Sequence, residues 1–169
     1  MKALLFSAFA GTIILASACS DSNHTDSATT TLDSTIAAPV TVMVDNGVKK
    51  QIELTSAQEV PANTSAGKGT ADLSYNKTSH MLTYTVNYSG LTGPATMAHI
   101  HGTAPKGVNA GVKHDLSSLL QKAAAGSFTD SVIVDGTSLS QDSLMSGLYY
   151  FNIHTAAHPG GEIRGQIDL

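Results

Sequence analysis

Two histidines stand one residue apart in the stretch AHIHG at 98–102. In an extended strand, residues two positions apart place their side chains on the same face, about 7 Å from each other. Two imidazoles at this spacing can close on one metal ion through bonds of about 2.0–2.1 Å. A third histidine, His154, is the natural additional ligand. His99, His101 and His154 are therefore the predicted metal ligands, and copper or zinc suits an all-imidazole site.

The same histidines allow a second interpretation. Their rings could serve only to hydrogen-bond the carbonyl groups of neighbouring loops, or to hold the long segment that follows His101. A His-x-His spacing is short enough to occur by chance, so a metal site requires that His154 converge on it. The sequence leaves both interpretations open.

Alternation along the strand that carries His154 assigns its two faces. Apolar residues at 149, 151 and 153 share the face expected to point into the core, so His154 points away from the core. The same alternation in the closing segment 159–167 puts Glu162 and Arg164 on an outward face. Glu162 or Arg164 is then expected to adjust the properties of the bound metal by contacting its ligands, without binding the metal directly.

The segments that must position these residues have the pattern of short β-strands separated by turn residues. The clearest is 82–88, where apolar and polar residues alternate, and the Asn46-Gly47 pair favours a hairpin between 40–44 and 49–54. Further strands are expected over 69–75, 96–101, 126–134, 148–154 and 161–169. This spacing predicts an all-β domain, an antiparallel β-sandwich or Greek-key barrel with a superoxide-dismutase-like fold.

Two stretches are compatible with helices. They cover 116–125 and 138–145, the second with Ser138 as its N-cap.

Composition excludes several classes of function. The 169 residues include 9 Lys and Arg against 13 Asp and Glu, with a net charge of −4, so no basic surface is available for nucleic acid. The single Cys excludes an internal disulfide and a CxxC pair. No Gly-x-Ser-x-Gly elbow or phosphate-binding glycine loop occurs, and Glu59 and Glu162 are expected to have structural roles. We expect no catalytic residues.

The N-terminus has the pattern of an export signal. A positive Met1-Lys2 pair precedes an unbroken run of apolar and small residues at 3–18, which is shorter than a membrane span. The residues LASAC ending at Cys19 resemble a bacterial lipobox, which implies lipidation of Cys19, and Ser20 after it favours the outer membrane. Ordinary cleavage near Ala18 and an uncleaved anchor are the alternatives.

The chain then divides into three parts: a signal peptide at 1–18, the lipidated Cys19 with a flexible tether to residue 39, and one β-domain at 40–169. The tether is rich in Ser, Thr and Asp and has too few large apolar residues to order itself. The expected location is the bacterial cell envelope, on the membrane through the lipid anchor.

Five motifs together resemble the CHRD family, which recurs in chordin and in bacterial exported proteins. In family order across about 50–169, they are QEVP at 58–61, GL at 90–91, AHIHG at 98–102, YFNIHT at 150–155 and PGGEIRGQ at 159–166. The resemblance implies a secreted or envelope β-domain and no established catalytic activity.

A weaker resemblance is to copper-zinc superoxide dismutase. There, too, a glycine-leucine turn, here in GLTGP at 90–94, precedes a His-x-His strand. It implies His99, His101 and His154 as copper ligands, with His158 or His114 as a fourth. The spaced histidines of the zinc loop and the disulfide are missing, so dismutase activity is not expected.

Two functions remain open. The first is a non-enzymatic binding module for a protein or glycan, which the resemblance to binders favours. The alternative is a copper- or zinc-binding protein that stores the metal or performs limited redox chemistry.

Overall fold

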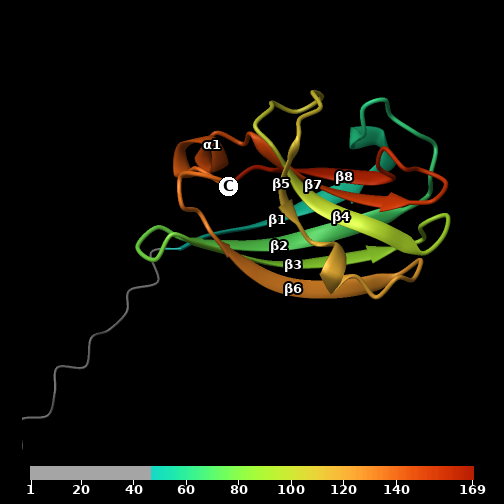
Figure 1. Ribbon diagram of the computed structural model, residues 1–169, viewed down its shortest axis with the longest axis horizontal. Coiled ribbons are helices and arrows are strands. Elements are labelled where there is room, and N and C mark those ends of the chain that lie inside the picture. The colour runs from blue at the N-terminus through green and yellow to red at the C-terminus, as the bar shows by residue number, and fades with distance from the viewer. Residues whose placement is uncertain (1–46) are drawn as a thin grey trace, which may run out of the picture. The chain divides into compact units, whose positions relative to one another are not determined.

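The computed structural model describes residues 47–169, which form one antiparallel eight-stranded sheet with a strand order of β5-β4-β7-β8-β1-β2-β3-β6 (Figure 1). The strands are β1 (Gly47–Thr55), β2 (Lys68–Asn76), β3 (Met81–Ser89), β4 (Ala95–Gly102), β5 (Val112–Asp115), β6 (Gly126–Ile133), β7 (Tyr149–Thr155) and β8 (Ile163–Ile167). The prediction of an all-β antiparallel fold is confirmed. The predicted strand 40–44, the tether and Cys19 lie outside the described residues.

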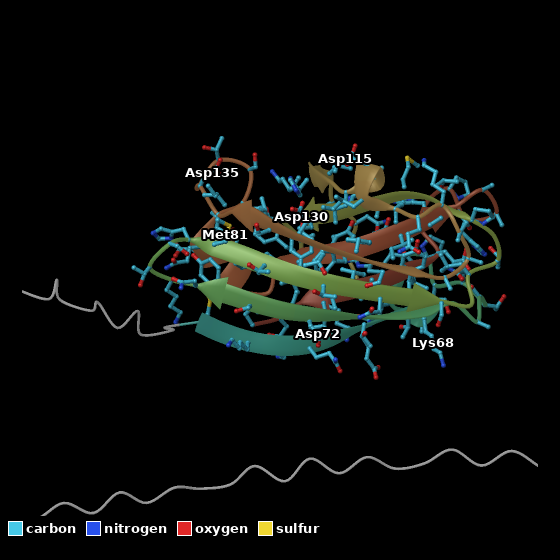
Figure 2. The ribbon with its side chains drawn as sticks, turned by 90° about the horizontal axis from the view of Figure 1, so that it is seen from below. Lys68, Asp72, Met81, Asp115, Asp130 and Asp135 are labelled. Atoms are coloured by element: carbon cyan, nitrogen blue, oxygen red, sulfur yellow. The ribbon has the colours of Figure 1, made fainter. Side chains whose placement is uncertain are left out.

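The sheet curls so that its two halves enclose one apolar core. Alternation explains which side chains enter it: Leu82, Tyr84 and Val86 of β3 are fully buried, while Thr83 and Thr85 face outward between them. Polar residues cover most of the outside of β1, β2, β3 and β6, and Asp72 projects from the outer face of β2 (Figure 2). This half of the molecule has the half-buried strands that its sequence predicts.

The other half differs, because β7 is buried on both faces. Phe151 and Ile153 point into the core as predicted, but Asn152 and His154 on the opposite face are also buried. Two loops cover this face. The β4–β5 loop reaches it through Ala110, and the segment after β7 reaches it through Pro159. Side chains expected to face outward therefore lie in an enclosed polar layer.

Helix is confined to short pieces. The predicted helix over 116–125 is wrong: only a 3₁₀ turn, Ser117–Leu119, forms there. The backbone of this segment bonds elsewhere: the Leu116 N–H donates to the Ala98 carbonyl. The carbonyls of Ala123 and Ala124 accept from the N–H groups of Ala95, the first residue of β4, and of Leu91 before it. The second prediction holds in part: α1 (Gln141–Met145) forms within 138–145, but its N-cap is Ser140 and not the predicted Ser138. Within residues 47–169 we find no helix with the length and apolar character of a membrane span.

The position of Glu162 differs from the expected outward face. It is fully buried, and its carboxylate joins three segments instead of lying beside the histidines. The hydroxyls of Ser65, Thr92 and Thr155 donate to it over 2.5, 2.8 and 2.5 Å, and the Thr92 N–H donates over 2.7 Å. Burial raises the pKa of Glu162, but these hydrogen bonds together lower it below its ordinary value. Glu162 is therefore a structural carboxylate.

Candidate metal centre

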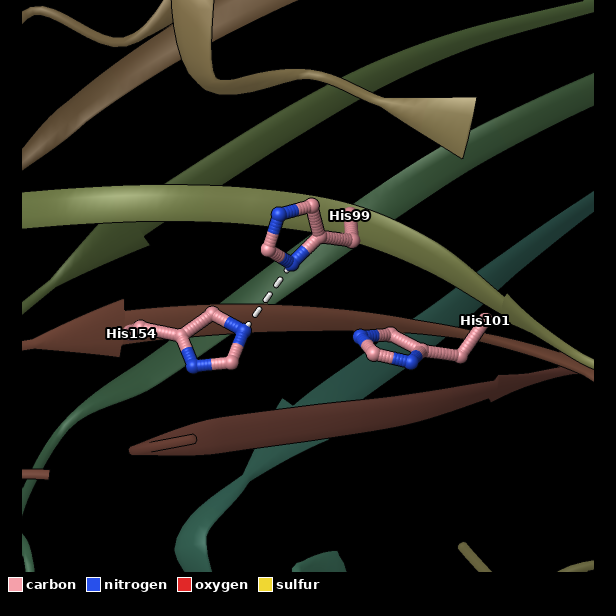
Figure 3. Close-up of side chains that lie close together, drawn as sticks. All are labelled: His99, His101 and His154. Atoms are coloured by element: carbon pink, nitrogen blue, oxygen red, sulfur yellow. Dashed lines mark hydrogen bonds between the residues drawn. The ribbon is translucent and has the colours of Figure 1, made fainter. Parts of the chain in front are cut away.

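The fold brings the three predicted histidines together. His99 and His101 lie on one face of β4, and His154 comes from β7, which pairs with β4 in the register Met97 to His154. One ring nitrogen from each histidine falls within 4.8 Å of the other two (Figure 3). Two adjacent strands thus supply all three imidazoles.

His99 and His154 approach each other most closely. His99 Nδ1 lies 3.1 Å from His154 Nε2, the contact drawn in Figure 3. The other nitrogen of His154, Nδ1, donates to the Pro159 carbonyl over 2.9 Å, which leaves Nε2 with a lone pair. His99 Nε2 lies 3.7 Å from a carboxylate oxygen of Asp115. The contact is a hydrogen bond between the two rings, and its length is close to the ~3.3 Å between two nitrogens bound to one metal ion, so an ion can take the place of the shared proton.

His101, like His154, uses its Nδ1 for a loop carbonyl and leaves Nε2 with a lone pair. Its Nδ1 donates to the Ala110 carbonyl over 2.9 Å, while its buried Nε2 has no hydrogen-bond partner among residues 47–169. The ring stacks on Tyr150 at 4.9 Å with an angle of 5° between the planes, and the Arg164 guanidinium lies 3.4 Å from the centre of the Tyr150 ring. The orientation of His101 is therefore defined by a carbonyl and an aromatic ring.

Electrostatics keep the three rings neutral, which is the form that binds metal. Burial lowers the pKa of His99, against a smaller opposing effect of Asp115. Burial likewise lowers the pKa values of His101 and His154, opposed by their hydrogen bonds to loop carbonyls. At neutral pH each imidazole has a lone pair available.

Both interpretations of the histidines thus correspond to real contacts. Two rings bond loop carbonyls, as a purely structural role requires, and the remaining nitrogens still face a common point. A carbonyl or carboxylate on the far nitrogen of a ligating imidazole is the usual arrangement around bound metal. The sequence did not reveal these partners, because Ala110, Asp115 and Pro159 lie outside the His-x-His motif.

Comparison with family models finds a match to the CHRD domain over residues 50–167. The chain belongs to the CHRD family. Comparisons with curated proteins and with solved structures find no match. The family assignment, predicted from five motifs, is confirmed over nearly all of the described residues.

The two histidines that the superoxide dismutase resemblance implied as a fourth ligand do not join the site. His114 lies on β5 opposite Ile100, and His158 lies in the turn after β7, where its backbone bonds Thr155. Among the described residues, the cluster of potential metal ligands contains His99, His101 and His154 and neither of these two. A fourth ligand from a histidine is therefore not provided by this arrangement.

A buried carboxyl lies beside the site. Glu59, in the loop after β1, accepts a hydrogen bond from the Asn152 side chain over 2.6 Å. Burial raises the pKa of Glu59 to about 7, against the opposing charge of Arg164 and hydrogen bonds from Val60 and Asn152. Gly161 makes room for this pair: it has φ of 127°, and a side chain there would collide with Asn152 and Glu59. The family motif QEVP thus contributes its glutamate to the layer that contains the histidines.

We predict that Glu59→Gln makes stability less dependent on pH. A carboxyl whose pKa is raised in the folded state contributes stability that is complete below its ordinary pKa of 4.5 and is lost as the pH rises through about 7. The amide cannot ionise and still accepts from Asn152. Between pH 4.5 and pH 8 the free energy of unfolding of the wild type should therefore fall by about 3 kcal/mol more than that of the variant.

Urea unfolding at pH 4.5, 6 and 8 measures this difference. Glu53→Gln, which changes an exposed carboxylate on β1, is the control. Parallel pH profiles for the wild type and Glu59→Gln would contradict the prediction.

Proposed function

We propose that this CHRD domain binds one copper or zinc ion through His99, His101 and His154. One observation carries the proposal: three imidazole nitrogens from two paired strands lie within 4.8 Å of one another. The far nitrogens of His101 and His154 are already occupied by carbonyls, so the lone pairs that remain face the same place. His101 Nε2 has no hydrogen-bond partner among the described residues, whereas His154 Nε2 shares a proton with His99 Nδ1. A cation would replace that proton and also bind the unpaired nitrogen of His101.

Imidazole ligands suit copper and zinc, and of the two copper generally binds more tightly. When bound, copper would supply one-electron redox chemistry and zinc a Lewis acid. The protein's own part is to hold the rings. Ala110 and Pro159 fix two imidazoles in the required tautomer, and Asp115 lies beside the third. A buried site of this kind suits storage or sequestration of the ion, with limited redox chemistry if the ion is copper.

Metal analysis of the purified full chain tests the proposal. After loading with copper(II) or zinc and exhaustive dialysis at pH 7.5, we expect one equivalent of bound metal. Because burial lowers the histidine pKa values, proton competition should begin only below the ordinary histidine value of 6.5, and further acidification should release the metal. A chain that retains neither ion would contradict the proposal and favour the non-enzymatic binding module.

We further propose that the domain is held at the cell envelope, on the outer membrane, by lipid on Cys19. The support is the lipobox-like sequence LASAC and the polar stretch 20–39 that follows it. Two or more acyl chains on one residue would give stable membrane attachment, whereas a single chain binds only weakly.

Cys19→Ser should accordingly move the protein from the membrane pellet to the soluble fraction. The expected result is near-complete release after a high-pH wash, since the substitution removes the only acylation site. Ser20→Ala retains Cys19 and serves as the matched control, which should remain in the pellet. Cys19→Ser protein that stays in the pellet would contradict lipid anchoring.

A further inference from the structure

Asn152 lies on β7 beside the histidine site. It pairs with His99 on one side and with Arg164 of β8 on the other, and it precedes His154 by two residues on the same face. Asn152 is 3% exposed. Its side chain therefore belongs to the same enclosed layer as the imidazoles, although it contributes no ligand in the set of three.

The amide of Asn152 is fixed by its nitrogen. Nδ2 donates to Glu59 over 2.6 Å and lies against the backbone of Gly161. Since the oxygen is on the other branch of the amide, Oδ1 is turned away from Glu59. This oxygen is buried and has no hydrogen-bond partner in the described part of the chain.

A buried acceptor without a donor is unfavourable, and no residue in the described part of the chain donates to Oδ1. Arg164 does not fill the role. Its guanidinium donates to the Val108 carbonyl over 2.9 Å and to Asn109 Oδ1 over 3.2 Å, and it packs on Tyr150. A small molecule bound in the polar layer would supply the missing donor.

We infer that Asn152 Oδ1 accepts a hydrogen bond from a water molecule bound to the metal as its fourth ligand. The inference rests on the proposed function, because the water needs the metal held by His99, His101 and His154. Three protein ligands plus one open position is the arrangement of metal sites that exchange a ligand. Asn152 then determines which ligand is preferred: water can donate to Oδ1, and an anion that only accepts hydrogen bonds cannot.

Azide is a suitable probe, since it binds copper(II) but offers no hydrogen to Oδ1. The experiment titrates azide into the copper(II)-loaded full chain and follows the azide-to-copper absorption band. The Asn152→Leu substitution removes the acceptor, so bound water loses its hydrogen bond and competes less well with azide. Azide should then bind about tenfold more tightly, which corresponds to the free energy of one hydrogen bond. Copper affinity should remain within about threefold of the wild type.

Two further variants keep the test decisive if Asn152→Leu folds poorly. Glu59→Met removes the partner of Nδ2, frees the amide, and should tighten azide binding in the same direction. Glu59→Gln retains that partner and should leave azide affinity unchanged. Asn63→Leu is the matched control, because this amide bonds the carbonyls of Gly161 and Glu162 in the same region.

The outcomes separate this inference from the proposed function. Wild-type protein that fails to bind copper overturns both. Copper binding with unchanged azide affinity in Asn152→Leu and Glu59→Met overturns only the role of Asn152. An equal gain in azide affinity in Asn63→Leu would also overturn the role of Asn152, because the effect would then arise from general disturbance of the loop.

Discussion

Alanine substitution of His99, His101 or His154 should weaken copper or zinc binding at least about 100-fold in each single variant. Each change removes one of three ligands, and two ligands that remain on a strand pair cannot enclose the ion. The triple variant should bind none. Isothermal titration calorimetry on the full chain gives the affinity, and the metal content after dialysis gives the stoichiometry.

The thermal stability of the same variants separates a metal site from structural histidines. His99 and His154 are buried, so their loss should lower the melting temperature of the metal-free protein by a few degrees. In the metal-loaded state the wild type should gain stability and the variants should not. His114→Ala on β5 is the control and should retain the metal. A triple variant that keeps its metal would rule out this site.

Glu162→Gln should destabilise the folded domain by about 4 kcal/mol and lower its melting temperature by roughly 12 °C. The carboxylate accepts four hydrogen bonds, from Ser65, Thr92 and Thr155. An amide can accept at one end only, so donors are left unpaired in a fully buried place. Copper affinity should be unchanged, because none of these three partners is a ligand.

The contribution of Glu162 to stability should depend on pH in a defined direction. A carboxyl whose pKa is lowered on folding contributes stability that is present above its ordinary pKa of 4.5 and is lost as the pH falls through the lowered value. The difference between the wild type and Glu162→Gln should therefore be largest at neutral pH and shrink in acid. Urea unfolding at pH 7 and pH 3 measures it, and a difference below about 1 kcal/mol at pH 7 would contradict the prediction.

Strand positions could be predicted wherever burial on one face imposed a pattern. The alternation at 82–88 is typical of a sheet with one solvent-exposed face, and β3 shows this alternation over its whole length. β5 was missed, because Val112–Asp115 is a four-residue edge strand with no buried residue to mark it. The stretch 116–125 has Leu116 and Leu120 at a helical spacing, yet its backbone bonds neighbouring segments. Tertiary hydrogen bonding outweighed local pattern there.

The candidate site shows the same limit. Alternation correctly placed His99, His101 and His154 on faces away from the core, and strand pairing brought them together; that they bind metal stays a prediction. Alternation says nothing about what covers a face, so the carbonyls over the histidines could not be foreseen. Glu162 was misplaced for a related reason: it precedes β8, where the alternation had not yet begun.

The loop over the histidines has a kinetic consequence. The Ala110 carbonyl accepts from both His101 Nδ1 and the Tyr150 hydroxyl, and the Ala110 N–H donates back to that hydroxyl. Under the proposed metal binding, an ion held by His101 Nε2 would be linked to this loop through the opposite nitrogen of the same ring. Opening of the loop would free that ring to turn, so release of the ion and movement of the loop should be coupled, and a substitution that loosens the loop should speed the loss of the ion to a competing chelator.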